Sequence, residues 1–322
     1  MSTPLVSIII LNWNGVKCIT ECLESVVATS YKYTEIIVVD NGSTDGSPEI
    51  VKKYATVLLA ALEKNIGFAA GNNAGFKIAK GKYIATLNND VIVGPDWLQQ
   101  PTELFEKYPS IGIVACRQMN YYHRDRIDCL YSYPQHSLLF KPMGFGKKFT
   151  DDNLLSRPGQ VIGAGGASAI YRKEVVIALG GFDERYFAYH EESDLCMRAF
   201  LDGWKCAYAP SAVVFHRGSF SFGRSIRQFA FYHERNRIWF IYKFYPFAYI
   251  AKNVFWILIM ELRLIRVWLF KRNVGRAYFL ARYHGFLGLV RLREDRKIYT
   301  AKFKEKQAIF NQFLRKKKLP LS

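Results

Sequence analysis

Four short, largely apolar runs that alternate with helix-like segments constrain the fold of this chain most strongly. The runs cover residues 5–11, 36–39, 57–62 and 83–87, and the first has the character of a strand buried on both faces of a sheet. The segments between them have the Gly, Asn and Ser content of turns and helix starts. Strands that alternate with helices in this way predict an α/β fold with a doubly wound, largely parallel sheet.

Acidic and polar residues follow three of these runs, at the edge where ligands collect in an open α/β sheet. Asp90 comes just after the run 83–87, where a carboxylate can hold a cation next to a phosphate. Asp40 ends the run 36–39, where an acid can accept hydrogen bonds from a base or a ribose. Either acid can instead serve a turn. The polar turn 12–15 has neither of the glycine-rich phosphate-binding fingerprints, so a nucleotide site here would use other residues.

A second group of acids follows the turn 180–184. Glu191, Glu192 and Asp194 fall within four residues, at a position that also suits the start of a helix. Asp194 and Arg198 are spaced for an ion pair along that helix, which is the structural alternative to a catalytic role. A short helix is also expected directly after the glycine-rich stretch that ends at Ser168.

Taken together, these stretches resemble glycosyltransferase family 2, the inverting nucleotide-sugar transferases with the GT-A fold, and in particular their bacterial rhamnosyltransferase-like branch. The similarity covers about residues 5 to 220 in family order, which is more specific than any single motif. The matching stretches are 6–14, 38–47, 65–73, 87–90, 180–184 and 189–198.

The resemblance implies a nucleotide-sugar pocket in which Asp40 contacts the base. The other residues that it assigns to this pocket are Asn12, Asn14, Asn65, Gly71, Asn72 and Asn88. It also implies that Asp90 binds a divalent cation, although Asn88 replaces the first acid of the family's D-x-D motif. Mg²⁺ tolerates one or two carboxylates when substrate phosphates and waters complete its shell, and Mn²⁺ is a reasonable substitute.

The family's E-D-x-D segment appears here as residues 191–194, and Glu192 matches its catalytic base. Such a base takes the proton of the acceptor hydroxyl as that hydroxyl attacks the anomeric carbon. Glu191 and Asp194 stay open as alternatives for this role. His216 lies where related enzymes carry a histidine near the metal, although a lone histidine after a strand is often structural. Trp13 is expected to pack in the core first, with stacking on a sugar or base as the alternative.

The charge of the chain is concentrated in its last hundred residues. Residues 224–322 contain 23 Lys and Arg but 5 Asp and Glu, whereas residues 1–223 contain 22 of each kind. We therefore predict a catalytic domain over 1–223 and a basic, amphipathic, helical membrane-association region over 224–322. Pro246 is expected to break the first helix of that region. A re-entrant or tilted segment over 247–270 is one alternative, and a helical subdomain packed on the catalytic domain is another.

The sequence thus predicts a peripheral enzyme on the cytoplasmic face of a bacterial membrane. Its expected partners are a nucleotide-sugar donor, a glycan or polyprenyl-linked acceptor used in surface polysaccharide assembly, and anionic lipid. Two other classes stay open: a nucleotide-dependent enzyme of another kind, and a basic membrane or nucleic-acid binding module without transferase activity. Nucleic acid is the weaker partner for the tail, because long aliphatic runs accompany its charge and no reading motif is present.

Overall fold

The computed structural model describes residues 3–150, 156–218, 225–271 and 273–321. The predicted boundary at residues 223 and 224 lies outside these ranges. The strands are β1 Val6–Asn12, β2 Thr34–Asp40, β3 Val57–Ala61, β4 Tyr83–Asn88, β5 Val91–Val93, β6 Ile111–Asn120, β7 Ile127–Cys129, β8 Ser132–Pro134, β9 Phe140–Pro142, β10 Gly159–Val161, β11 Ser168–Arg172 and β12 Lys205–His216. The helices are α1 Ile19–Val27, α2 Ser47–Val51, α3 Phe68–Ile78, α4 Gln99–Lys107, α5 Lys173–Ala178, α6 Glu191–Leu201, α7 Ile226–Phe244, α8 Phe247–Lys252, α9 Val254–Ile265, α10 Gly275–Gly288 and α11 Arg293–Lys316, with short turns η1 Glu184–Tyr186, η2 Arg266–Lys271 and η3 Leu289–Leu292.

The predicted α/β architecture is confirmed, and its strands are where the apolar runs placed them. One large sheet has the order β10-β12-β6-β11-β4-β1-β2-β3, with β5 beside β12 and β7 beside β6. All seven residues of β1 are buried, as the unbroken apolar run indicated, because parallel neighbours β2 and β4 flank it and helices cover the sheet. The register sets Asn12 opposite Asp40 and Leu11 opposite Asn88, so these polar residues end their strands at the same edge.

The prediction of a largely parallel sheet was wrong for one half of the molecule. β11 runs antiparallel between β4 and β6, and β5, β7 and β10 also pair antiparallel, so the sheet is mixed. The cause is that the chain enters β11 directly at the carboxyl edge of β4, where Ser168 lies opposite Leu87, without a crossover helix. The expected helix after Ser168 is therefore preceded by this strand, and it begins at Lys173. The stretch 121–150 contains the three short strands β7, β8 and β9.

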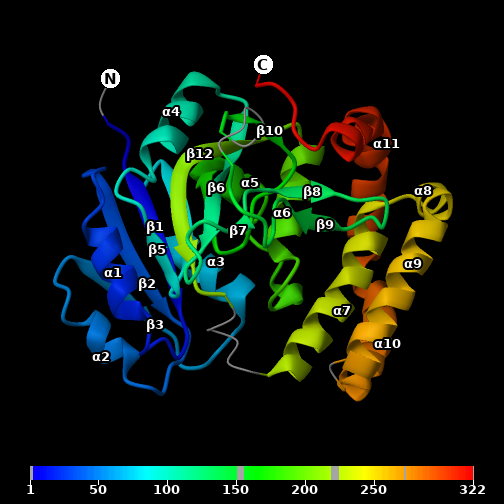
Figure 1. The fold of residues 1–322 in the computed structure, drawn as a ribbon, viewed down its shortest axis with the longest axis horizontal. Helices are drawn as coiled ribbons and strands as arrows, with labels where there is room; N and C mark the ends of the chain where they lie inside the picture. The colour runs from blue at the N-terminus through cyan, green and yellow to red at the C-terminus, as the bar shows by residue number, and fades with distance from the viewer. Residues whose placement is uncertain (1–2, 151–155, 219–224, 272, 322) are drawn as a thin grey trace.

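The C-terminal helices lie together beside the sheet (Figure 1). Ser225 caps α7 by accepting a hydrogen bond from the Gln228 amide. The helix ends at Phe244, which confirms that Pro246 breaks it, and α8 begins directly after the proline. α7 and α11 share a buried core with α6, whose members include Met197, Phe200, Phe240, Phe244, Phe303, Phe310 and Phe313.

The other C-terminal helices leave large apolar side chains exposed. Phe255, Leu258 and Leu262 on α9 and Phe279 and Phe286 on α10 are each more than half exposed. Within the described ranges, no helix is both long enough and apolar enough to cross a membrane.

Candidate active site

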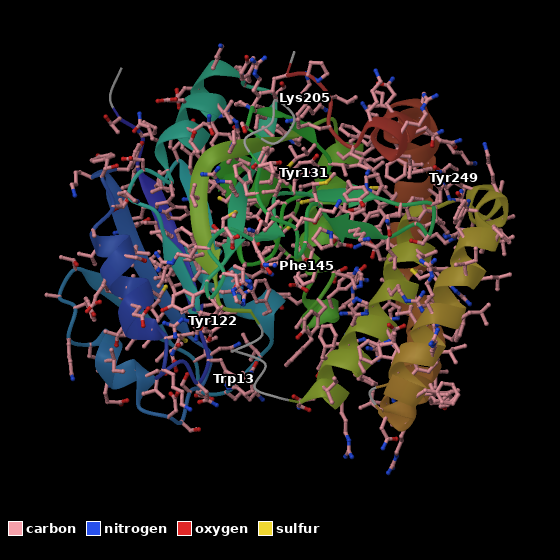
Figure 2. All side chains as sticks on the ribbon, viewed as in Figure 1. Trp13, Tyr122, Tyr131, Phe145, Lys205 and Tyr249 are labelled. Carbon is pink, nitrogen blue, oxygen red and sulfur yellow. The ribbon has the colours of Figure 1, made fainter. Side chains whose placement is uncertain are left out.

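Two adjoining cavities lie at the carboxyl edge of the sheet. The first has a volume of about 220 Å³ and the second about 310 Å³. Figure 2 labels one residue from each, Trp13 and Phe145. The two cavities share a wall, so a group on that wall can contact ligands bound on either side. The shared lining residues are Gly166, Ala167, Tyr189, Glu192 and His216.

Strand pairing brings Asp90, His216 and Asp128 together from distant parts of the chain. β5 follows Asp90 directly and pairs with β12, where His216 lies opposite Val91. β12 also runs beside β6, with His216 opposite Asn120. β6 in turn pairs with β7, the short strand that carries Asp128.

His216 bridges the two carboxylates. Its Nε2 lies 3.5 Å from Asp90 Oδ1, and its Nδ1 lies 2.9 Å from Asp128 Oδ2. Burial alone would lower the pKa of His216, but hydrogen bonds and charge from Asp128 and Asp90 outweigh it and raise the pKa to about 10. An imidazole whose second nitrogen is held by a carboxylate is the arrangement found around metal-ligating histidines.

The donor set fits a divalent cation that is completed by substrate. Asp90 and His216 both line the first cavity, whereas Asp128 lines only the second and holds His216 from behind. In the described part of the chain, no three His, Cys, Asp or Glu side chains converge as a full metal site. Mg²⁺ is commonly held by one or two carboxylates together with substrate phosphates and waters, and Asp90 would supply such a carboxylate here.

Glu192 occupies the shared wall at the start of α6. Burial raises the pKa of Glu192 above its ordinary value. Glu191 also lines the first cavity but is 4% exposed, and burial followed by the charge of Glu192 raises its pKa well above the ordinary range. Of the three acids in this segment, Glu192 alone lines both cavities.

The structure does not bring Asp194 to either cavity. The side chain is fully buried, and Arg198 Nε donates to its Oδ2 over 2.6 Å, which is the helix ion pair anticipated as the alternative. Lys243 Nζ on α7 donates to its Oδ1, also over 2.6 Å. With both oxygens engaged by cations, Asp194 is placed to fix α6 rather than to accept a substrate proton.

The residues assigned to the nucleotide-sugar pocket fall into two groups. Asn65 and Asn88 line the first cavity. Asn12 and Asp40 do not line it and are almost completely buried. Asn12 Nδ2 donates to Asp40 Oδ1 over 2.7 Å and to Ser47 Oγ over 2.8 Å, so this pair holds the loop after β2 in place.

Asn14, Gly71 and Asn72 do not line the first cavity. The Asn14 side chain accepts a hydrogen bond from the Thr44 amide, which joins two loops. Asn72 is buried and donates to the carbonyl of Phe68 within its own helix. Gly71 has a packing role, because a Cβ there would lie 2.6 Å from Leu11 Cδ1 and would force the Leu11 side chain to move.

Residues outside the predicted site also line the two cavities. Trp13, for which stacking on a sugar or base was the alternative to packing, lines the first cavity and is partly exposed. Asn41 also lines it and lies inside the matched stretch 38–47, which offered a signal. His190 and His233 line the second cavity, where their rings lie 5.0 Å apart. His233 comes from α7, and no local motif connects it with a site built around residue 192.

The chain is similar in sequence to known proteins. A 30% identical relative, the uncharacterized protein y4gI of Sinorhizobium fredii, matches 69% of this chain, which spans only 25% of that protein's length. The N-acetylglucosaminyl-diphospho-decaprenol L-rhamnosyltransferase of Mycobacterium tuberculosis is 27% identical over 63% of this chain and 72% of its own.

A mannosyltransferase from Pyrobaculum calidifontis, solved in complex with GDP-Man and Mn²⁺, has a similar fold. It matches 95% of this chain and 88% of its own length with a TM-score of 0.54 and 18% identity. The sequence pattern described as "Glycosyl transferase family 2" matches residues 7–180, more than half of the chain. The chain therefore belongs to glycosyltransferase family 2, and its mixed α/β fold is of the GT-A type.

Proposed function

We propose that this glycosyltransferase moves a sugar, with inversion, from a nucleoside-diphosphate sugar to a hydroxyl group of a glycan. The observation that carries the proposal is the position of Glu192 on the wall between two cavities, with Asp90 in the lining of the first. The donor would occupy the first cavity and the acceptor the second. A base between them reaches the acceptor hydroxyl at the moment when its oxygen approaches the anomeric carbon.

In the proposed reaction, the residues of this chain carry out one proton transfer. The acceptor oxygen bonds to the anomeric carbon, the bond from that carbon to the diphosphate breaks, and Glu192 takes the hydroxyl proton. Asp90 and His216 would hold Mg²⁺ or Mn²⁺ against the diphosphate, with Asp128 orienting His216. The bound cation would neutralise the charge that develops on the leaving nucleoside diphosphate.

The acceptor we propose is a lipid-linked glycan used in bacterial surface polysaccharide assembly. Two observations support it: the rhamnosyltransferase relative is named for a diphospho-decaprenol acceptor, and the C-terminal helices of this chain combine exposed apolar side chains with an excess of basic residues. We propose that α8, α9 and α10 lie in the interface of the cytoplasmic face of the membrane, as a peripheral attachment. The enzyme would then work at the surface that carries its acceptor.

A donor screen tests this function. The purified protein would be heated with UDP-, GDP- and dTDP-sugars, each with Mg²⁺, with Mn²⁺ or with EDTA, while its melting temperature is followed. We expect one nucleotide class to stabilise the protein only when a divalent cation is present, and slow hydrolysis of that donor in the same mixture. Full stabilisation in EDTA, or hydrolysis that survives Glu192→Gln, would contradict the proposed site.

A further inference from the structure

A third, smaller cavity lies away from the first two and is lined by arginines. It has a volume of about 110 Å³ and lies between η1, α7 and η3. None of its lining residues belongs to either of the larger cavities. Its lining consists of Arg185, Arg235, Trp239, Gly288, Arg291 and Leu292.

The cavity carries more positive than negative charge. Arg185 is balanced by Asp183 and Asp295, with which it forms ion pairs. Among the described residues, no carboxylate pairs with Arg235 or Arg291. Two of the three guanidinium groups therefore lack a counter-ion within the described fold.

Arg235 is held firmly in this cavity. Its Nη2 donates to the carbonyls of Arg185 and Tyr186, over 3.1 and 2.8 Å, and its guanidinium carbon lies 4.2 Å from the centre of the Trp239 ring. Burial lowers the pKa of Arg235 to about 10, which still leaves it cationic near neutral pH. Its Nε donates to Asn236 Oδ1 over 2.9 Å, so the N–H groups of Nη1 remain to donate to a phosphate oxygen.

An exposed apolar stripe lies on α10, the helix that supplies Gly288 to the cavity. Gly288 keeps η3 close to α7, since a Cβ there would lie 2.5 Å from the Trp239 ring. Leu287 and Val290 flank the cavity residues Gly288 and Arg291 in sequence and are 56% and 61% exposed. The stripe continues back along one face of α10 through Phe286, Tyr283 and Phe279.

We propose that this cavity binds the phosphate of an anionic phospholipid headgroup, whose acyl chains lie against the apolar stripe. The inference rests on the membrane attachment proposed above and adds a defined lipid site to it. A free phosphate ion would use the same guanidinium groups, but it would leave the adjacent stripe uncovered. The combination of a basic cavity with an apolar flank therefore favours the lipid as the source of the phosphate.

Vesicle flotation with the full chain tests the proposal. The vesicles would be phosphatidylcholine alone, the same lipid doped with phosphatidylglycerol, or doped to equal surface charge with oleate, which adds a carboxylate and no phosphate. Arg291→Gln and Arg235→Gln are compared with Arg293→Gln, a control that removes an exposed arginine outside the cavity. Arg291 has no described side-chain partner, so Arg291→Gln keeps the test valid even if Arg235→Gln fails to fold.

We expect both cavity variants to bind phosphatidylglycerol vesicles about tenfold more weakly than Arg293→Gln, and oleate vesicles no more weakly than the control. Equal losses in all three variants would overturn the site while leaving membrane attachment intact. If the wild-type protein bound none of the vesicles, both the lipid site and the membrane attachment would be overturned. If inorganic phosphate without vesicles raised the melting temperature in an Arg235-dependent way, and vesicle binding were unaffected, the lipid source would be refuted. Donor-dependent melting shifts, measured in parallel, keep the transferase function separate from these outcomes.

Discussion

Lys243 on α7 places its ammonium group 2.6 Å from the carboxylate of Asp194 on α6. Asp194 lies two residues after Glu192 and four residues before Arg198, with which it also pairs. The same ammonium lies 2.9 Å from Asp183, in the turn that precedes α6. All three groups are shielded from solvent. The ion pair therefore ties α6, whose first turn carries the proposed base, to the C-terminal part of the chain.

Replacing Lys243 with methionine should destabilise the protein strongly. The substitution leaves the buried carboxylate of Asp183 and one oxygen of Asp194 without this cation, and breaking such a pair costs about 3–5 kcal/mol of unfolding free energy. Chemical denaturation followed by circular dichroism measures the loss. Lys252→Met, at an exposed lysine of the same region, is the control and should change stability little. Equally small losses of unfolding free energy in the two variants would show that the ion pairs of Lys243 do not stabilise the fold.

This ion pair also shows where reading the sequence reaches its limit. The apolar runs predicted β1, β2 and β4, and the acids at 191–194 predicted the start of α6, because both signals are local. The count of basic residues treated Lys243 and Arg237 as part of a charged surface, yet both are buried in ion pairs. Net charge does not tell which of the charged residues are buried. The sequence therefore left a helical subdomain packed on the catalytic domain only as an alternative, whereas α7 and α11 do share a buried core with α6.

The residues of the candidate site were likewise predictable only where the signal in the sequence is local. Asn88 ends a strand, Asp90 follows it and Glu192 lies in the first turn of a helix, so their edge of the sheet was predictable. Asp128 depends on the pairing of β7 with β6, and His233 depends on the packing of α7. Such contacts join residues about 90 positions apart or come from another helix, and no local pattern specifies them.

Asp90→Asn should abolish sugar transfer and weaken metal-dependent binding of nucleoside diphosphate. The amide keeps the shape of the side chain but loses the charge that would attract the cation. Isothermal titration with nucleoside diphosphate, with and without Mn²⁺, reports the binding loss. Asp202→Asn, at an acid with a partly exposed ion pair beyond the end of α6, is the matched control. Transfer by Asp90→Asn at the wild-type rate would exclude Asp90 from the site.

Glu192→Gln should preserve donor binding and lower the transfer rate by roughly 10²- to 10⁴-fold, the range typical of lost general-base catalysis. Glutamine matches the size of glutamate but does not accept the proton. Glu191→Gln should cost less, since the Glu191 carboxyl is buried with a pKa held well above its ordinary range. Asp194→Asn should lower stability rather than the rate of the folded enzyme, because Asp194 lies in ion pairs. If Glu191→Gln gave the larger rate loss with intact donor affinity, the base would be Glu191.

The pH dependence of kcat/KM should show an acid limb above the ordinary glutamate pKa of 4.5. Burial raises the pKa of Glu192, and a general base works only when it is ionised. Activity should therefore fall as pH falls through this raised value, while circular dichroism shows that the fold persists. Steady-state rates at subsaturating donor, measured at each pH, give the profile. A limb at or below 4.5 would show that the essential base is a solvated carboxylate instead.

Attachment to membranes should depend on both the charge and the apolar side chains of the C-terminal helices. Raising the salt concentration should weaken binding to anionic vesicles, because screening shortens the reach of the basic residues. Phe286→Ser should lower vesicle affinity about tenfold, through the loss of an apolar side chain that inserts among lipids. Ile177→Ser on α5 is the matched control, since Ile177 is 65% exposed and Phe286 is 63% exposed.

Sedimentation with phosphatidylcholine and phosphatidylglycerol vesicles measures these changes. An equal loss for both substitutions would contradict interfacial binding by α10. Extraction of the protein from membranes tests the remaining alternative, a re-entrant or tilted segment over residues 247–270. Release from membranes by salt is expected for helices that lie in the interface. Retention in high salt with release only by detergent would instead indicate deep insertion of that segment.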